Sequence, residues 1–320
     1  MVLRVYFAQL RRGRSVKTFL QPIIAIVSAI CLLALASCGR VYETSSFADS
    51  AVESKSGQTT APAGEPSRLR VTVIDVGKGD CILIQADDAA VLIDTGYEST
   101  ANDVLSCLRD QGVSNLDAII ITHYDRDHIE GIRPIGEDVG VGTIYLPGYE
   151  GTDKNYRACI LAVEALGVPS QRVTEELDLY VGGARLTVFP SGVSYEPGTG
   201  KEEGNDNDMS LVATLVNGRD SYLFAGDLEE EGIDAYLSGG HGQFDVLKMP
   251  HHGKHSSNLS ELLDDVRPQI AVITDSEEDS ASKKTLKLLK SANVQTHRSS
   301  KEGTITVESD GSGTYSVLTA

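Results

Sequence analysis

The sequence predicts a layered α/β domain over residues 68–320. Two successive blocks of short apolar runs, each interrupted by segments with helical spacing, fill this region. Strands and helices that alternate in this way pack as layers around a shared core. No short fixed repeat is visible, which argues against a solenoid. The region, of about 250 residues, has the size of one large domain.

In the first block, an alternating apolar run stops at Gly77, and two further runs flank the turn-prone pair Asp87-Asp88. A later segment places Val104 and Leu108 on one helical face. The last run is apolar throughout, as in strands that are buried on both faces. We therefore expect strands at 69–75, 82–85, 91–93 and 118–122, and a helix at 101–111.

The second block repeats this style with short apolar runs and amphipathic segments. We expect strands at 185–189, 210–216, 221–224, 244–248, 270–274 and 304–307. We expect helices at 229–237, 259–266 and 282–291.

The amino-terminal residues have the order of a secretory signal. Basic residues come first, an apolar run spans 23–35, and small residues follow. The segment around Cys38 resembles the lipobox of bacterial lipoproteins, which implies acylation of this cysteine. We therefore expect a lipoprotein signal peptide at 1–37, a flexible tether at 38–67, and export to the outer side of the bacterial cell membrane. An uncleaved membrane anchor is the alternative.

Charge and cysteine content narrow the functional classes. The formal charge is −18, and it becomes −23 without residues 1–37, which hold five basic and no acidic residues. A field of this sign disfavours binding to duplex DNA. Beyond Cys38 only Cys81, Cys107 and Cys159 remain, so the domain is no disulfide scaffold, and we expect buried free thiols.

Five of the seven histidines fall in two short segments, each directly after an apolar run. The first segment contains His123, Asp125, Asp127 and His128. Imidazole together with carboxylate suits zinc, manganese or iron better than calcium. A solvated polar loop is the alternative, but close carboxylates repel one another unless a cation offsets them.

The second segment contains His251 and His252, again at the end of an expected strand. A third candidate is Asp227, which follows Gly226 after another apolar run. Alone, this Gly-Asp pair would indicate a common turn. Beside the two histidine segments, it becomes a candidate bridging ligand between two metal ions.

The run H-x-D-x-D-H with the later G-D and H-H-G resembles the metallo-β-lactamase superfamily, in particular the hydrolase domain of ComEC-type competence DNA-uptake proteins. Stretches 74–80, 92–96, 207–212 and 303–305 agree in the same order. The resemblance implies a four-layer αβ/βα sandwich. The sequence departs from this pattern at four places. Lys78 replaces the usual glutamine, Glu130 replaces a glycine, Lys254 replaces a serine, and the stretch 275–280 is acidic.

The resemblance also implies two divalent metal ions, zinc or manganese. His123 and Asp125 would hold one ion, Asp127 and His128 the second, and Asp227 would bridge them. One of His251 or His252 completes the set; we assign His251 as the ligand, and His252 together with Asp127 as catalytic. Asp125 and the stretch 207–210 stand where β-lactamases have histidines, so one site would be rich in oxygen ligands, which favours manganese.

The expected function is an extracytoplasmic phosphodiesterase or nuclease that uses a metal-activated hydroxide. Its expected partners are the membrane, through lipidated Cys38, and a phosphodiester or small-molecule substrate, with single-stranded nucleic acid among the candidates. The alternatives are hydrolysis of a small ester, a lactam or a phosphocholine-like headgroup, and a non-catalytic metal-binding envelope lipoprotein. A basic rim around the site would favour nucleic acid, whereas an acidic or apolar rim would favour a small substrate.

Overall fold

The computed structural model describes residues 65–193 and 206–320. These residues lie in the second of two compact units, which begins at Thr60. The expected signal peptide 1–37, Cys38 and nearly all of the expected tether 38–67 lie outside the described residues. Among the described residues, no helix has the length and apolar character needed to cross a membrane.

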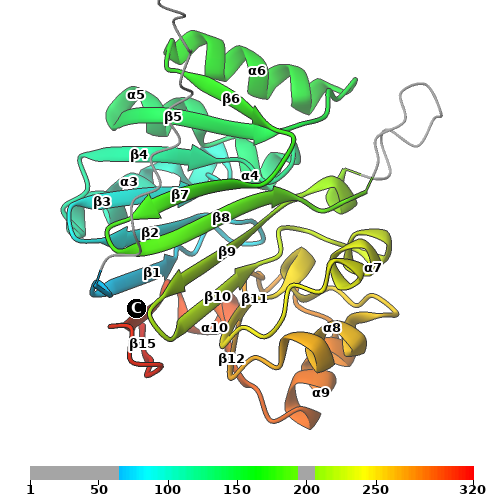
Figure 1. Cartoon of the computed structure of the whole chain (residues 1–320). Helices are drawn as coiled ribbons and strands as arrows, with labels where there is room; N and C mark the ends of the chain where they lie inside the picture. The colour runs from blue at the N-terminus through cyan, green and yellow to red at the C-terminus, as the bar shows by residue number, and fades with distance from the viewer. Residues whose placement is uncertain (1–64, 194–205) are drawn as a thin grey trace, which may run out of the picture. The chain divides into compact units, whose positions relative to one another are not determined.

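Two mixed β-sheets form the centre of this unit (Figure 1). The first has the strand order β15 (Ser316–Thr319), β14 (Ile305–Ser309), β1 (Leu69–Val73), β2 (Ile82–Ala86), β3 (Ala89–Ile93), β4 (Asn115–Ile120), β5 (Gly140–Pro147) and β6 (Ser170–Val173). The second has the order β13 (Gln295–Arg298), β12 (Ile270–Ile273), β11 (Val246–Lys248), β10 (Asp220–Phe224), β9 (Leu211–Asn217), β8 (Ala184–Pro190) and β7 (Leu177–Val181).

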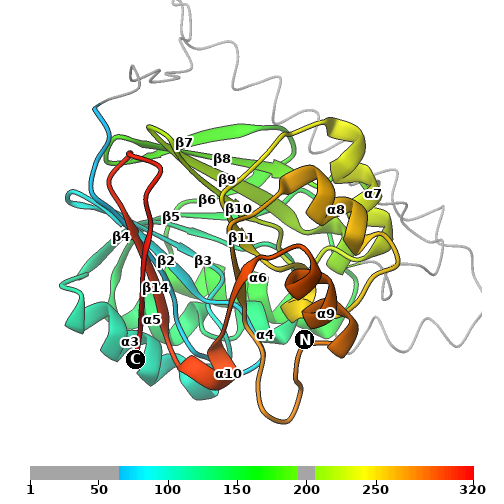
Figure 2. The same cartoon turned by 90° about the horizontal axis from the view of Figure 1, so that it is seen from below.

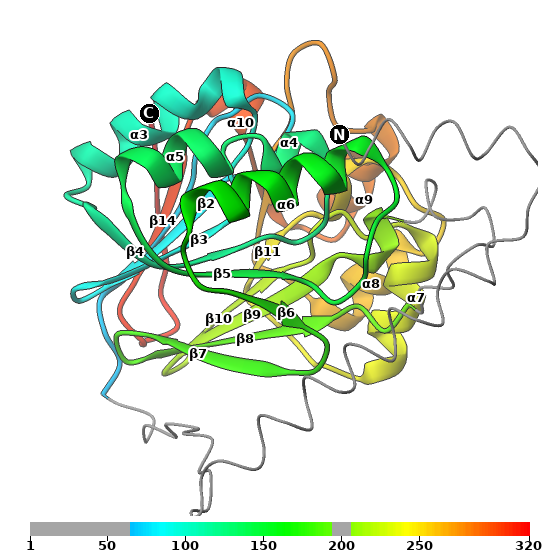
Figure 3. The same ribbon diagram turned by 90° about the horizontal axis from the view of Figure 1, so that it is seen from above.

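Helices cover the outer face of each sheet (Figures 2 and 3). The first sheet carries α3 (Ala101–Asp110), α4 (Arg126–Ile129), α5 (Ile132–Asp138) and α6 (Lys154–Leu166). The second carries α7 (Glu230–Gly239), α8 (Leu259–Val266) and α9 (Lys283–Ser291), and the short α10 (Ser299–Glu302) leads from β13 to β14. The 3-10 turns are η2 (Glu98–Thr100), η3 (Asn207–Met209) and η4 (Pro250–Gly253).

Three apolar clusters hold these four layers together. Strand side chains alternate between them: Ile82 and Ile84 of β2 lie between the sheets, whereas Leu83 packs beneath the helices of the first sheet. The continuous run in β4 divides in the same way, with Ile120 between the sheets and Ile119 under the helices. The third cluster joins the second sheet to α7, α8 and α9. The predicted four-layer αβ/βα sandwich is confirmed.

The structure extends the predicted elements. Every expected strand and helix is present, with ends shifted by a few residues; the run predicted as a strand at 118–122, for example, ends at Ile120. Residues 126–181, for which the sequence predicted no helix or strand, form α4, α5, β5, α6, β6 and β7. The three described cysteines are free, as expected, but Cys107 is only partly buried.

Candidate metal centre

Parallel strands direct the site's side chains to one place. Strands β3, β4 and β5 are parallel in the first sheet, and β10, β11 and β12 are parallel in the second. Side chains that follow the carboxyl ends of parallel strands gather at one edge of a sheet. Here the residues that follow these ends include Asp94 after β3, His123 after β4, Asp227 after β10, His252 after β11 and Thr274 after β12.

The first histidine segment wraps around the end of β4. His123 and His128 are both fully buried, and their ring centroids lie 4.1 Å apart. Asp127 is buried at the start of α4, where its backbone carbonyl accepts a hydrogen bond from the Asp80 amide at 3.1 Å. Asp125 differs, because 44% of its side chain is exposed, and its Oδ2 lies 3.8 Å from His123 Nε2.

Asp227 lies between the imidazoles that the two sheets contribute. Its Oδ2 is 2.9 Å from His252 Nε2 and 3.4 Å from His128 Nε2. The preceding Gly226 has a φ of +52°, and a Cβ there would lie 2.7 Å from the Ser210 Cβ, so a side chain would meet a steric conflict. The close turn brings the buried Asp227 carboxylate to the strand end, in the place that the sequence suggested for a bridging ligand.

The two adjacent histidines of the second segment have different surroundings. His251 and His252 both have left-handed backbone conformations, with φ of 44° and 52°. His252 is buried, and its Nε2 is 3.4 Å from Asp127 Oδ2 as well as 2.9 Å from Asp227 Oδ2. The His251 side chain is 21% exposed, and its Nδ1 lies 2.9 Å from Glu229 Oε1. The structure therefore brings His252 into the cluster. His251 was the ligand expected from the sequence, but its side chain contacts Glu229 instead.

Asp94 is a buried partner of the site that the sequence analysis did not assign. Its carboxylate accepts hydrogen bonds from the Thr122 amide and hydroxyl, both at 2.8 Å, and contacts His128 Nδ1 at 2.7 Å. A carboxylate on Nδ1 fixes the histidine tautomer and directs the lone pair of Nε2 toward the site. Asp94 directly follows the apolar strand β3, so the rule that selected Asp227 could also have found it.

A second set of partners holds His252. Its Nδ1 lies 2.9 Å from the Thr274 hydroxyl, which donates a hydrogen bond to Asp80 Oδ1 at 2.7 Å. The buried Lys248 ammonium pairs with Asp80 Oδ2 and donates to the Gly226 carbonyl at 3.1 Å. These residues form a second layer of support behind the imidazole.

The chemistry of this donor set fits a divalent cation. Within residues 65–193 and 206–320, the Nε2 atoms of His123, His128 and His252 are buried and have no hydrogen-bond partner. Buried polar atoms without a partner are costly unless a ligand engages them. Five carboxylates meet two ammonium groups here: Asp80, Asp94, Asp125, Asp127 and Asp227 face Lys78 and Lys248. The surplus of negative charge calls for cations.

Two groups of ligand atoms are close enough to hold an ion. One joins His123, His128 and Asp227, and the other joins Asp127, His128 and His252. A third joins His128 to Asp94, which contacts its Nδ1, and to Asp80. An imidazole nitrogen has one lone pair, so His128 Nε2 serves one ion, and the Asp227 carboxylate can serve two.

The pKa shifts agree with a cation-binding role. Burial alone would lower the pKa of His252, but the charge of Asp227 and the contacts with Asp127 outweigh it and raise this pKa to about 9. Burial would raise the pKa of Asp127, but its contact with His252 and the charge of His128 hold it well below its usual range. A proton on His252 occupies the nitrogen that a cation needs, so cation binding releases this proton.

The entrance of the site carries charges of both signs. Lys78 Nζ donates to Asp127 Oδ2 at 2.7 Å, and Lys254 pairs with Asp279. Asp125 and Glu229 add partly exposed carboxylates to the same region. The rim is therefore not uniformly basic.

Comparisons with known proteins agree with this architecture. A family model described as the metallo-beta-lactamase superfamily matches residues 74–273. ComE operon protein 3 of Bacillus subtilis (strain 168) is 28% identical over 275 residues, which cover 78% of this chain and 34% of that protein. Competence protein ComA of Neisseria gonorrhoeae is 28% identical over 207 residues, which cover 63% of this chain and 26% of that protein. The chain thus spans about a third or less of the length of these relatives.

Among solved structures, the metallo-beta-lactamase fold protein YhfI from Bacillus subtilis shares the fold with a TM-score of 0.53 and 16% identity, over 76% of this chain and 100% of that chain. The family model covers well over half of the chain, and the predicted resemblance is confirmed. The chain belongs to the metallo-beta-lactamase superfamily, and its curated relatives include competence proteins.

Proposed function

We propose that this protein is an extracytoplasmic, metal-dependent phosphodiesterase. The observation that carries the proposal is the set of three buried imidazole nitrogens without hydrogen-bond partners, which lie among buried carboxylates. A divalent ion bound there would supply Lewis-acid chemistry, since it lowers the pKa of a water molecule and stabilises negative charge on a phosphoryl oxygen.

We assign two ions, zinc or manganese, to the cluster. His123, Asp125 and Asp227 would hold the first ion. Asp127, His128 and His252 would hold the second, with Asp227 shared. This assignment moves His252 from the catalytic set to the ligand set, because its Nε2 faces both Asp127 and Asp227. The carboxylate content of the first position favours manganese there.

The chain's own residues prepare the site for this chemistry. Asp94, itself held by Thr122, contacts His128, and Thr274, which donates to Asp80, contacts His252, so both rings keep their Nε2 atoms directed inward. Asp127 would also orient the attacking water, because its Oδ2, which accepts the Lys78 hydrogen bond, also lies 3.4 Å from His252 Nε2 inside the cluster. Rigid placement of such groups removes much of the entropic part of a reaction barrier.

The charge of the protein favours small or single-stranded phosphodiesters over duplex DNA. The chain has a formal charge of −18, and partly exposed Asp125, Glu229 and Asp279 flank the site with Lys78 and Lys254. A duplex needs an extended basic surface to release its counterions. The competence proteins among the relatives keep single-stranded nucleic acid among the candidate substrates.

A second candidate is hydrolysis of a small ester, a lactam or a phosphocholine-like headgroup. The acidic groups on the rim favour it, because a small neutral or zwitterionic substrate experiences less repulsion there than a polyanion. For both candidates we propose export and lipid anchoring through Cys38, on the basis of the signal-like residues 1–37 and the lipobox-like sequence that follows.

A substrate panel tests the proposal. The full-length protein, loaded with manganese or zinc, is assayed against bis-nitrophenyl phosphate, single-stranded DNA, a phosphocholine ester and a β-lactam. We expect metal-dependent hydrolysis of bis-nitrophenyl phosphate. Turnover of only the β-lactam or only the phosphocholine ester would support the second candidate. A protein that binds metal but turns over none of the four would favour the alternative of a non-catalytic metal-binding lipoprotein.

A further inference from the structure

We propose that Lys78 is a built-in competitor for the cation position formed by Asp127, His128 and His252. Its ammonium group binds the Asp127 oxygen that faces His252, and it thereby weakens the affinity of this position for a divalent ion. The position is then filled only at higher concentrations of free cation. The inference rests on the metal binding of the proposed function and not on the hydrolysis of any substrate.

The competition concerns a single oxygen atom. Lys78 Nζ lies 2.7 Å from Asp127 Oδ2, and the same Oδ2 lies 3.4 Å from His252 Nε2. The exposed fraction of the Lys78 side chain is 24%, and Asp127 is buried. Water therefore screens this ion pair less than it screens a pair on the open surface.

The backbone holds Lys78 against Asp127. The amide of Gly77 donates to Asp75 Oδ1 at 3.0 Å, and Gly77 has a φ of +77°. A Cβ at Gly79 would lie 2.6 Å from the Asp127 carbonyl oxygen, so the loop approaches α4 as closely as a glycine permits. The Asp80 amide then donates to that carbonyl. The backbone on both sides of Lys78 is thus held beside α4, which keeps its ammonium group within reach of Asp127.

Lys248, the other lysine of the site, has a different role. It pairs with Asp80, and its Nζ lies 3.5 Å from Asp227 Oδ1. The other oxygen of Asp227, Oδ2, stays directed at His252 and His128. Lys248 therefore does not contact Asp227 Oδ2, the oxygen that faces the histidines. Lys78, by contrast, binds Asp127 Oδ2, the oxygen that faces His252.

Electrostatics gives the direction and the scale of the effect. An ammonium group and a divalent ion that share one carboxylate oxygen repel each other at short range, and the ion must also displace part of an existing ion pair. Removal of the positive charge should therefore tighten cation binding at this position by a factor of about ten or more. Glutamine is usual at this position in the ComEC-type hydrolase domains that the sequence resembles. Its side-chain amide can still donate a hydrogen bond to Asp127 without carrying a charge.

Metal titration of the full-length protein tests this inference. The protein is freed of metal by chelation, and manganese binding is measured by calorimetry and by elemental analysis after equilibrium dialysis. The same titration is run on Lys78→Gln, on Lys78→Arg, which keeps the charge, and on Lys290→Gln, an exposed lysine of α9. Circular dichroism and thermal melting establish that each variant is folded, and Lys78→Ala serves as a second neutral variant.

We expect Lys78→Gln and Lys78→Ala to tighten one binding event at least about tenfold and to leave the other unchanged. Lys78→Arg and Lys290→Gln should bind as the parent does. A parent that binds one ion beside a Lys78→Gln variant that binds two would support the inference as well. Unchanged or weaker binding in both neutral variants would overturn it, and so would a parent that binds no divalent metal. If the affinity shift is found but no variant hydrolyses a phosphodiester, the inference stands and the proposed function fails.

Discussion

The adjacent histidines His251 and His252 offer a paired test of which side chain binds metal. We expect His252→Asn to lose metal affinity and His251→Asn to keep it. Both residues have a positive φ, and asparagine tolerates this conformation better than other non-glycine residues, so backbone strain is small and similar in both variants. The comparison therefore isolates the imidazoles.

The expected magnitudes follow from the surroundings of each ring. Loss of a residue that merely supports a metal ligand costs about 10- to 100-fold in affinity, so loss of a ligand should cost about 100-fold or more. His252 Nε2 lies 2.9 Å from Asp227 Oδ2 in a buried setting. His251 contacts the partly exposed Glu229, and such a pair is worth at most about 1 kcal/mol. His251→Asn should therefore change the metal affinity by no more than about fivefold.

The assay is competition for zinc or manganese against a chromogenic chelator, with the parent and both variants measured side by side. Thermal melts in the presence of chelator serve as the control for folding. A large loss of affinity in His251→Asn together with parental affinity in His252→Asn would refute the geometric assignment. It would restore His251 as the ligand that the sequence analysis assigned.

Three further outcomes follow from individual residues. Cys38→Ser should leave the protein uncleaved or released from membranes, and a variant that matures and fractionates like the parent would contradict the lipoprotein assignment. Asp94→Asn should lower metal affinity about 10- to 100-fold in a chelator competition, because an amide cannot accept all the hydrogen bonds that hold His128. Burial and the charge of Asp125 raise the pKa of Asp206 to about 6, above its value in the unfolded state. Between these two pKa values the folded protein keeps the Asp206 proton, whereas the unfolded chain has lost it. Stability should therefore fall by about 2 kcal/mol as pH rises from about 4 to 6, and urea titrations of Asp206→Asn should lack this decline.

Most of the architecture could be predicted because its elements have strong local signals. The continuous apolar run of β4 and the alternation in β1 are typical of strands at those places. Residues 126–181 lack such signals: α5 contains Pro134 and Gly136, and β6 has the polar sequence Ser170–Val173. Proline is compatible with the first turn of a helix, but in a sequence pattern it usually indicates that a helix is interrupted. Tertiary packing, rather than propensity, determines these elements.

The candidate ligand groups were predictable where they follow apolar strands, as His123, His128 and Asp227 do. Their supporting residues were harder to predict, because they meet only through the fold. Thr274 and Asp80 are 194 residues apart in sequence and lie within hydrogen-bond distance only because the strands bring both to the same edge. The choice between His251 and His252 depended on a left-handed backbone at both positions, which no sequence pattern indicates.

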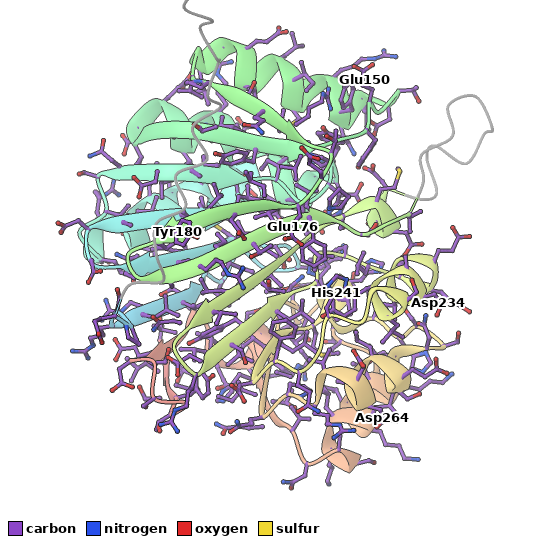
Figure 4. The ribbon with its side chains drawn as sticks, viewed as in Figure 1. Glu150, Glu176, Tyr180, Asp234, His241 and Asp264 are labelled. Carbon is purple, nitrogen blue, oxygen red and sulfur yellow. The ribbon has the colours of Figure 1, made fainter. Side chains whose placement is uncertain are left out.

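The choice of control residues also depends on the structure. Asp206 lies near the site and hydrogen-bonds to the buried Tyr149, so its loss would change more than surface charge. Asp264 lies on the outer helix α8, where it is exposed (Figure 4). Asp264→Asn therefore provides the matched carboxylate-to-amide control for variants of the metal centre.

The most direct test of the central claim is the rate of bis-nitrophenyl phosphate hydrolysis by the full-length protein, measured metal-free, after metal loading, and in metal-loaded Asp127→Asn. We expect no turnover without metal, turnover after loading, and a loss on the order of a hundredfold or more in Asp127→Asn, while Asp264→Asn keeps parental activity. Equal turnover by the metal-free and metal-loaded proteins, or parental activity in Asp127→Asn, would contradict the claim that this cluster is a hydrolytic metal centre.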